Sequence, residues 1–136
     1  MIEIDTGLRK NLIMADLTLQ LKRKKPMSKV KREAAGLKDV KITILKKQSN
    51  KDLIEEYTVF GKEPYICDKF EEGQQFISRG LRMPDGFCSW AWADIQRDVA
   101  ILSFGANYPS TKKKGTVVVC CTDAYRPVVF KLERIE

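Results

Sequence analysis

The sequence predicts a single small α+β domain in which a mainly antiparallel sheet of about four strands packs on one main helix. Residues 40–44 and 128–132 alternate apolar and polar side chains, which is typical of strands with one buried face. Residues 89–104 carry apolar side chains at helical spacing. Residues 1–38 differ from the rest in charge and are predicted to form a basic helical extension, which places the domain at residues 39–136.

Size and composition indicate one soluble, cytoplasmic protein. At 136 residues, with 43% hydrophobic and 32% charged residues, the chain fits one globular domain. The first residues are acidic rather than basic, and no apolar run reaches the ~18 residues of a membrane span. We therefore expect neither a signal peptide nor a membrane span. The four cysteines of such a chain are expected to be reduced thiols.

The extension contains the first predicted helix, over residues 8–25. Apolar residues recur at three- and four-residue spacing from Leu8 to Leu19, and a basic run followed by Pro26 ends the pattern. Residues 1–40 hold ten Lys and Arg against five Asp and Glu, whereas the remainder is nearly balanced. Contact with nucleic acid or an anionic membrane surface is thus expected only through the extension. The alternative is a solvated or partner-packed extension.

The first half of the domain is predicted to hold two strands and a short helix. After the strand at residues 40–44, Asn50 offers a cap for a short helix that ends near Tyr57. Gly73 then marks a turn before a short strand over residues 75–79.

The main helix is predicted to run from about residue 89 to residue 104. Ser89 is expected to cap it, and Gly105 supplies its stop. Its apolar stripe is predicted to consist of Trp92, Ile95, Val99 and Leu102. The opposite, polar side is predicted to carry Asp94, Arg97 and Asp98.

Two strands are predicted to close the domain. Residues 116–122 are apolar on both faces, so we place this strand in the centre of the sheet. Residues 123–126 are predicted to turn the chain. The strand that follows from Val128 alternates cleanly between an inner and an outer face, and Pro127 suits its start.

The absence of histidine excludes several familiar kinds of site. Without it the chain cannot build a Ser-His-Asp triad, a Cys-His pair or a His-ligated metal centre. The chain also lacks the glycine-rich signatures of loops that cradle phosphates.

The cysteines are the remaining candidates for chemistry. Paired C-x₂-C knuckles of a zinc site are absent. Cys120 and Cys121 are adjacent on a predicted strand, so their side chains should point to opposite faces. A thiolate-bound metal would need Cys67, Cys88 and one of that pair, with Cys120 as the assigned third ligand and Asp123 as the candidate fourth. The alternative for each cysteine is structural burial.

Cys88 is the strongest candidate for a reactive thiol. It directly precedes the main helix, where unpaired N–H groups and the helix dipole favour a thiolate. We assign Cys121 as a second thiol, with Cys120 as the alternative, and Asp94 as a nearby carboxylate in the same catalytic set.

Ligand-binding candidates flank this cysteine and occupy the last turn. Trp90 does not join the apolar stripe, and an exposed tryptophan suggests a ligand or a partner. Arg126 is predicted either to bind an anion while Asp123 orients it, or to be solvated in a turn whose backbone Asp123 caps.

Four blocks of the chain resemble a family of small, uncharacterised prokaryotic proteins of about 95 residues. These blocks are VKITILKK at 40–47, MPDGFCSWAW at 83–92, CCTD at 120–123 and RPVVFKLER at 126–134. A looser block, Cys67 with Phe70, is similar to C-P-x-F, although Asp68 replaces the proline. The resemblance implies that the cysteine blocks belong to the design of the family and that residues before about 39 are an extension. It implies no reaction.

Two functions from different classes follow from these residues. The first is a small cytosolic thiol-dependent protein centred on Cys88, acting in redox chemistry, in metal handling or as a nucleophile. The alternative is a non-catalytic accessory module that binds a small molecule or a protein near Trp90, Asp94 and Arg126.

Overall fold

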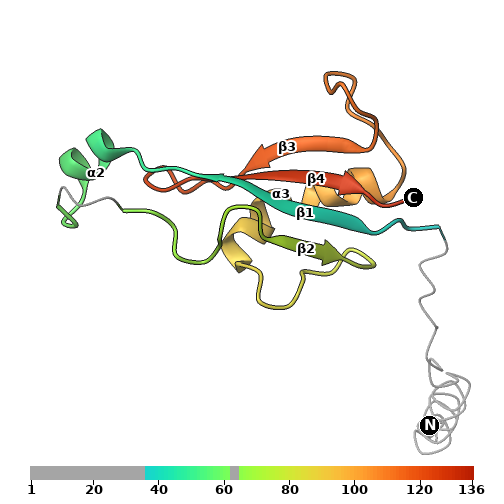
Figure 1. Cartoon of the computed structure of the whole chain (residues 1–136), viewed down its shortest axis with the longest axis horizontal. Helices are drawn as coiled ribbons and strands as arrows, with labels where there is room; N and C mark the ends of the chain where they lie inside the picture. Colours follow the sequence, from blue (N-terminus) through green and yellow to red (C-terminus); the bar gives the residue numbers. More distant parts are fainter. Residues whose placement is uncertain (1–35, 62–64) are drawn as a thin grey trace, which may run out of the picture. The chain divides into compact units, whose positions relative to one another are not determined.

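The computed structural model describes residues 36–61 and 65–136, and this part of the chain has the predicted α+β architecture. Four strands form one antiparallel sheet in the order β2-β1-β4-β3 (Figure 1). They are β1 (Val40–Lys47), β2 (Gln75–Ser78), β3 (Thr116–Cys120) and β4 (Val128–Arg134). The two helices in the described residues are α2 (Lys51–Tyr57) and α3 (Ser89–Ser103). The helix predicted for residues 8–25 lies outside the described residues.

Neither helix in the described ranges has both the length and the apolar character needed to cross a membrane.

The core lies between α3 and one face of the sheet. β1 and β4 pair along most of their length, and their alternating inward residues are at most 1% exposed. These residues are Val40, Ile42, Ile44, Val128, Phe130 and Leu132. Ala91, Ile95, Val99 and Leu102 of α3 pack in the same core. Burial of each large apolar side chain contributes about 1.5–3 kcal/mol relative to exposure. The period-two and helical patterns therefore identified the correct faces of these three elements.

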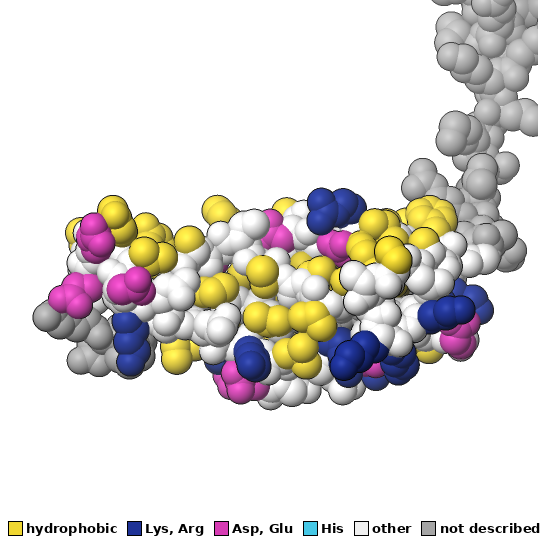
Figure 2. Space-filling model, turned by 90° about the horizontal axis from the view of Figure 1, so that it is seen from above, with side chains coloured by type: hydrophobic (Ala, Val, Ile, Leu, Met, Phe, Trp, Pro, Cys, Tyr) yellow, Lys and Arg dark blue, Asp and Glu magenta, His cyan; other side chains and the backbone are white. Residues whose placement is uncertain are grey.

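The prediction that the third apolar strand is central was wrong, because β3 lies at an edge of the sheet and, within residues 36–61 and 65–136, pairs with β4 alone. Val117 is buried, but Val118 on the other face is 55% exposed. The strand ends at Cys120, two residues earlier than predicted. No helix among the described residues covers the second face of the sheet, so the outward valine does not indicate a central position. The molecule seen from the β3 side shows hydrophobic side chains interspersed with Lys and Arg (Figure 2).

The prediction that Asp98 lies on the solvent side of α3 was also wrong. Asp98 is only 5% exposed, and its carboxylate accepts a hydrogen bond from the hydroxyl of Tyr108. Burial, together with the hydrogen bond and charge of Asp98, raises the pKa of Tyr108 to about 12. Asp98 lies three residues after Ile95 and four before Leu102, so it shares their helix face. The Tyr108 hydroxyl supplies a hydrogen bond to this carboxylate on the buried face of α3.

The ends of α3 lie close to their predicted positions, but the cap residue differs. Ser89 is the first helical residue, and Cys88 occupies the N-cap position without a side-chain capping bond. The helix ends at Ser103, and Gly105 follows it with a φ of 89°, a conformation that glycine adopts without steric cost.

Phe70 ties the segment after α2 to the core. It is 2% exposed, and its ring lies 5.0 Å from that of Phe87 and 5.5 Å from that of Phe130, centroid to centroid. Phe87 directly precedes the N-cap of α3. These aromatic contacts hold the segment around Phe70 against the start of α3 and against β4.

Candidate functional site

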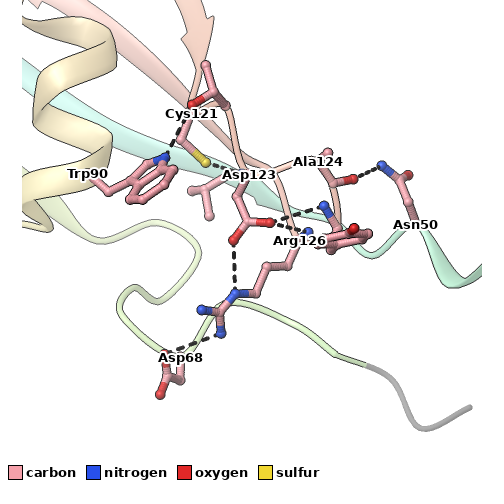
Figure 3. Close-up of polar contacts among 10 residues, drawn as sticks. Asn50, Asp68, Trp90, Cys121, Asp123, Ala124 and Arg126 are labelled. Atoms are coloured by element: carbon pink, nitrogen blue, oxygen red, sulfur yellow. Dashed lines mark hydrogen bonds and ion pairs between the residues drawn. The ribbon is translucent and has the colours of Figure 1, made fainter. Parts of the chain in front are cut away.

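A pocket of about 240 Å³ opens where the start of α3, the segment around Phe70 and the turn between β3 and β4 meet. Ten residues from these three places line it: Cys67, Lys69, Phe70, Cys88, Trp90, Ala91, Cys121, Asp123, Arg126 and Val128. Five of the six residues predicted for catalysis or ligand binding are therefore brought together, and Asp94 is the exception. A close view of the turn shows Trp90 beside Cys121, with Asp123 and Arg126 further along the chain (Figure 3).

Three of the four thiols line this pocket. Cys67 and Cys88 are half-buried and Cys121 is buried, whereas Cys120 is exposed and lies outside the lining. All four are free cysteines. The prediction that Cys120 and Cys121 point to different sides of the strand agrees with this difference in exposure.

The predicted metal set of Cys67, Cys88 and Cys120 does not assemble. Within residues 36–61 and 65–136, no group of three or more Cys, Asp or Glu side chains is placed to hold a metal ion. Cys120 lies at the end of the edge strand with its side chain exposed, and it does not reach the pocket of the other two.

Cys121 is held by the backbone of β4. Its N–H donates to the carbonyl of Val128 at 3.1 Å, and the N–H of Val128 donates to the Cys121 sulfur at 3.3 Å. The pairing of β3 with β4 is therefore extended by one residue beyond the strand. This pairing turns the Cys121 side chain into the pocket wall.

Trp90 is fixed at the rim of the pocket although it is 67% exposed. Its indole N–H donates to the Thr122 hydroxyl at 3.2 Å, and that hydroxyl lies 3.1 Å from the Asp94 carboxylate. The N–H of Thr122 also donates to Asp94, at 2.8 Å. Trp90 and Asp94 are four residues apart on one face of α3, so both reach the same threonine. Asp94 thus fastens the turn to the helix instead of lining the pocket as predicted.

Asp123 organises the turn and orients Arg126. One carboxylate oxygen accepts the backbone N–H groups of Tyr125 and Arg126, at 3.0 and 3.1 Å. The other accepts the Nε–H of Arg126 at 3.0 Å. Asn50 holds the outer side of the turn, because its amide donates to the Ala124 carbonyl at 2.6 Å rather than capping α2. Asp123 therefore both caps the backbone of the turn and orients Arg126, which are the two roles considered for it from the sequence.

Arg126 is not simply solvated. Its side chain is 25% exposed, and its guanidinium carbon lies 4.4 Å from the centre of the Tyr65 ring. Burial opposes the guanidinium charge, but the hydrogen bond to Asp123 and the nearby Tyr65 and Cys67 raise the pKa of Arg126 above its ordinary value. Arg126 therefore stays a fixed cation in the pocket wall, close to the Cys67 thiol.

Sequence reasoning missed Lys69, Phe70 and Tyr65, which precede α3 by many residues. The loose C-x-x-F block was the only signal that the segment at 67–70 belongs with the cysteines. No local pattern places Tyr65 under Arg126, because that contact depends on how the loop crosses the end of the sheet.

Comparisons with protein-family models, with curated proteins and with solved structures found no match for this chain. The resemblance to an uncharacterised prokaryotic family thus stays a prediction that rests on the sequence blocks.

Proposed function

We propose that the domain is a small thiol-dependent protein that binds a small molecule in the pocket and presents Cys88 to it as a nucleophile. One observation carries the proposal: three of the four cysteines, distant in sequence, line one pocket together with Trp90 and a fixed arginine. A pocket of this kind, apolar with a few convergent polar groups, is typical of small-molecule sites. The proposal fits a reducing cytoplasm, in which these thiols stay free.

Cys88 is better suited to attack than the other two pocket thiols. It is half-buried, and among the described residues its side chain makes no hydrogen bond. It directly precedes the 15-residue helix α3, whose N-terminal dipole favours negative charge. The Cys121 sulfur already accepts the N–H of Val128 and is buried. Cys67 lies in the segment between α2 and β2 and does not stand at a helix N-terminus. Cys121 and Cys67 are therefore assigned as accompanying thiols.

The chemistry is a nucleophilic displacement. The Cys88 thiolate forms a bond from sulfur to an electrophilic carbon or sulfur of the ligand, and the leaving group departs with the electron pair of the broken bond. With a small disulfide as substrate, the first step gives a mixed disulfide and one free thiolate. A second pocket thiol then displaces the other half, so that two protein thiols are oxidised and one ligand disulfide is reduced.

Alkylation mapping tests this proposal, with Cys120 as the internal control. The folded, reduced protein is treated with limiting iodoacetamide at neutral pH, and each cysteine is followed by mass spectrometry. Cys88 is expected to react about tenfold faster than Cys120, although Cys120 is the more exposed thiol. The Cys120→Ser variant should leave the rate at Cys88 unchanged.

The alternative function is non-catalytic binding, and the hydrogen-bonded position of Trp90 at the rim favours it as the second candidate. The same alkylation map separates the two. If Cys88 reacts no faster than Cys120, thiol chemistry at this site is refuted and a binding module remains.

A further inference from the structure

Arg126 holds unused hydrogen-bonding capacity toward the pocket. Its Nε–H is taken by Asp123, whereas the nearest carboxylate to a terminal nitrogen is Asp68, 3.9 Å away and 72% exposed. An arginine has five N–H donors in a fixed planar fork. In the described residues, its terminal N–H groups therefore make no close hydrogen bond, although the residue lines the pocket.

The orientation of this fork is set from two sides. Asp123 holds the Nε end, and both oxygens of Asp123 are already occupied by N–H donors of the turn and of Arg126. The Tyr65 ring lies under the guanidinium plane. A guanidinium held in this way loses little side-chain entropy when it binds an oxyanion in a bidentate manner.

The charges of the pocket lining also favour an anion. Lys69 and Arg126 are its cations, and Asp123 is its one carboxylate. Within the described part of the chain, Lys69 makes no ion pair, so its charge is not neutralised by a neighbour. The Asp68 carboxylate, 3.9 Å from Arg126, is exposed to solvent and does not line the pocket.

We infer that the small molecule bound in this pocket carries an oxyanion, which the terminal N–H groups of Arg126 hold while the electrophilic atom faces Cys88. This inference rests on the proposed function and adds the class of ligand to it. Carboxylate and phosphate share the required chemistry, because both offer paired oxygens to an arginine fork.

Two reagents that differ only in charge test the inference. Iodoacetate and iodoacetamide both form a bond from the cysteine sulfur to carbon and release iodide with its electron pair. The ratio of the iodoacetate rate to the iodoacetamide rate is measured at Cys88 and divided by the same ratio at Cys120. We expect this normalised ratio to be about five, because one partly solvated charge pair stabilises the bound anionic reagent by roughly 1 kcal/mol.

Arg126→Gln is expected to bring the normalised ratio close to one. Arg97→Gln is the matched control, since Arg97 is also cationic but is 79% exposed on α3 outside the pocket. It should leave the ratio unchanged. A wild-type ratio near one overturns the oxyanion inference while rapid reaction with iodoacetamide leaves the thiol proposal standing. Slow reaction of Cys88 with both reagents refutes the thiol proposal instead.

Competition identifies the source of the oxyanion. Sodium acetate and sodium phosphate are added separately to the iodoacetamide reaction, with sodium chloride at matched ionic strength as the reference. Slower alkylation of Cys88 with acetate alone supports a carboxylate, and slower alkylation with phosphate supports a phosphate ligand. Absence of protection by either salt, with Cys88 still reactive, contradicts the inference.

Discussion

The cluster around Glu133 and the turn at residues 121–126 are both built from charged side chains, but they use those charges differently. Glu133 is 14% exposed, and the ammonium groups of Lys131, Lys41 and Lys113 lie 3.1, 3.2 and 3.4 Å from its carboxylate. Burial opposes its charge, but these three lysines lower the pKa of Glu133 to about 2. We call these four residues the Glu133 cluster.

The turn, in contrast, leaves part of its charge unpaired. Asp123 is occupied by the backbone of the turn and by the Nε–H of Arg126. Arg126 lines the pocket, and a terminal nitrogen of its guanidinium reaches an exposed carboxylate, that of Asp68, only at 3.9 Å. The Glu133 cluster surrounds its one carboxylate with cations and holds two neighbouring strands together. The difference shows where to look for function: charge that is fixed in place but not fully paired is available to a ligand.

Removing the carboxylate of the Glu133 cluster should give the largest loss of stability. Glu133→Gln leaves three lysines close together without their shared anion, so we expect the free energy of unfolding to fall by about 1–3 kcal/mol at pH 7. Chemical denaturation measures this. The rates of alkylation at Cys88 and Cys121 should not change, and a change in them would show that the two regions are coupled.

The same carboxylate predicts an acid transition. Its pKa is about 2 in the folded protein against an ordinary 4.5, so its stabilisation is complete above about pH 5 and is lost as the pH falls toward 2. The Glu133→Gln variant lacks this component. Its stability should therefore converge with that of the wild type at the acidic end of the range.

The sequence predicted the parts of the domain that depend on local periodicity. The alternation in β1 and β4 and the apolar face of α3 follow from side-chain geometry within one element, so their buried residues were identified correctly. The position of β3 could not be predicted in this way. A strand with two apolar faces indicates a central place only if both faces of the sheet are covered, and Val118 is exposed here.

The candidate site was predicted in composition but not in arrangement. Trp90, Cys88, Asp123 and Arg126 were chosen for their chemistry, and the fold places all four in one pocket. Asp94 was given a catalytic role, but it binds Thr122. That contact spans 28 residues of sequence and depends on how α3 crosses the end of β3, which no local pattern specifies.

Asp94→Ala should reduce stability less than Glu133→Gln but more than Lys113→Ala, and it should also change the pocket. It removes the acceptor for both the N–H and the hydroxyl of Thr122, so Thr122 keeps the hydrogen bond from the Trp90 indole but loses those that tie it to Asp94 of α3. We expect the free energy of unfolding to fall by about 1–2 kcal/mol and the alkylation rate at the buried Cys121 to rise several-fold. Asp94→Asn is the control, because its amide oxygen still accepts one hydrogen bond. Equal rates at Cys121 in the wild type and in the alanine variant would show that the contact between Asp94 and Thr122 does not shield the Cys121 thiol.

Lys113→Ala should have the smallest effect and thereby tests whether the Glu133 cluster is as tightly paired as the distances indicate. The Lys113 side chain is 76% exposed and lies 3.4 Å from Glu133, whereas Lys41 and Lys131 are each 34% exposed and lie closer. Exposed ion pairs contribute about 0–1 kcal/mol, since water and salt screen them. We therefore expect a loss of stability below about 0.5 kcal/mol for Lys113→Ala and a larger one for Lys131→Ala. Carbonyl-detected NMR of Glu133 should show its pKa rising less in Lys113→Ala than in Lys131→Ala, because the first variant keeps the two closer and less exposed lysines. An equal rise in the two variants would mean that exposure does not weaken the ion pair with Lys113.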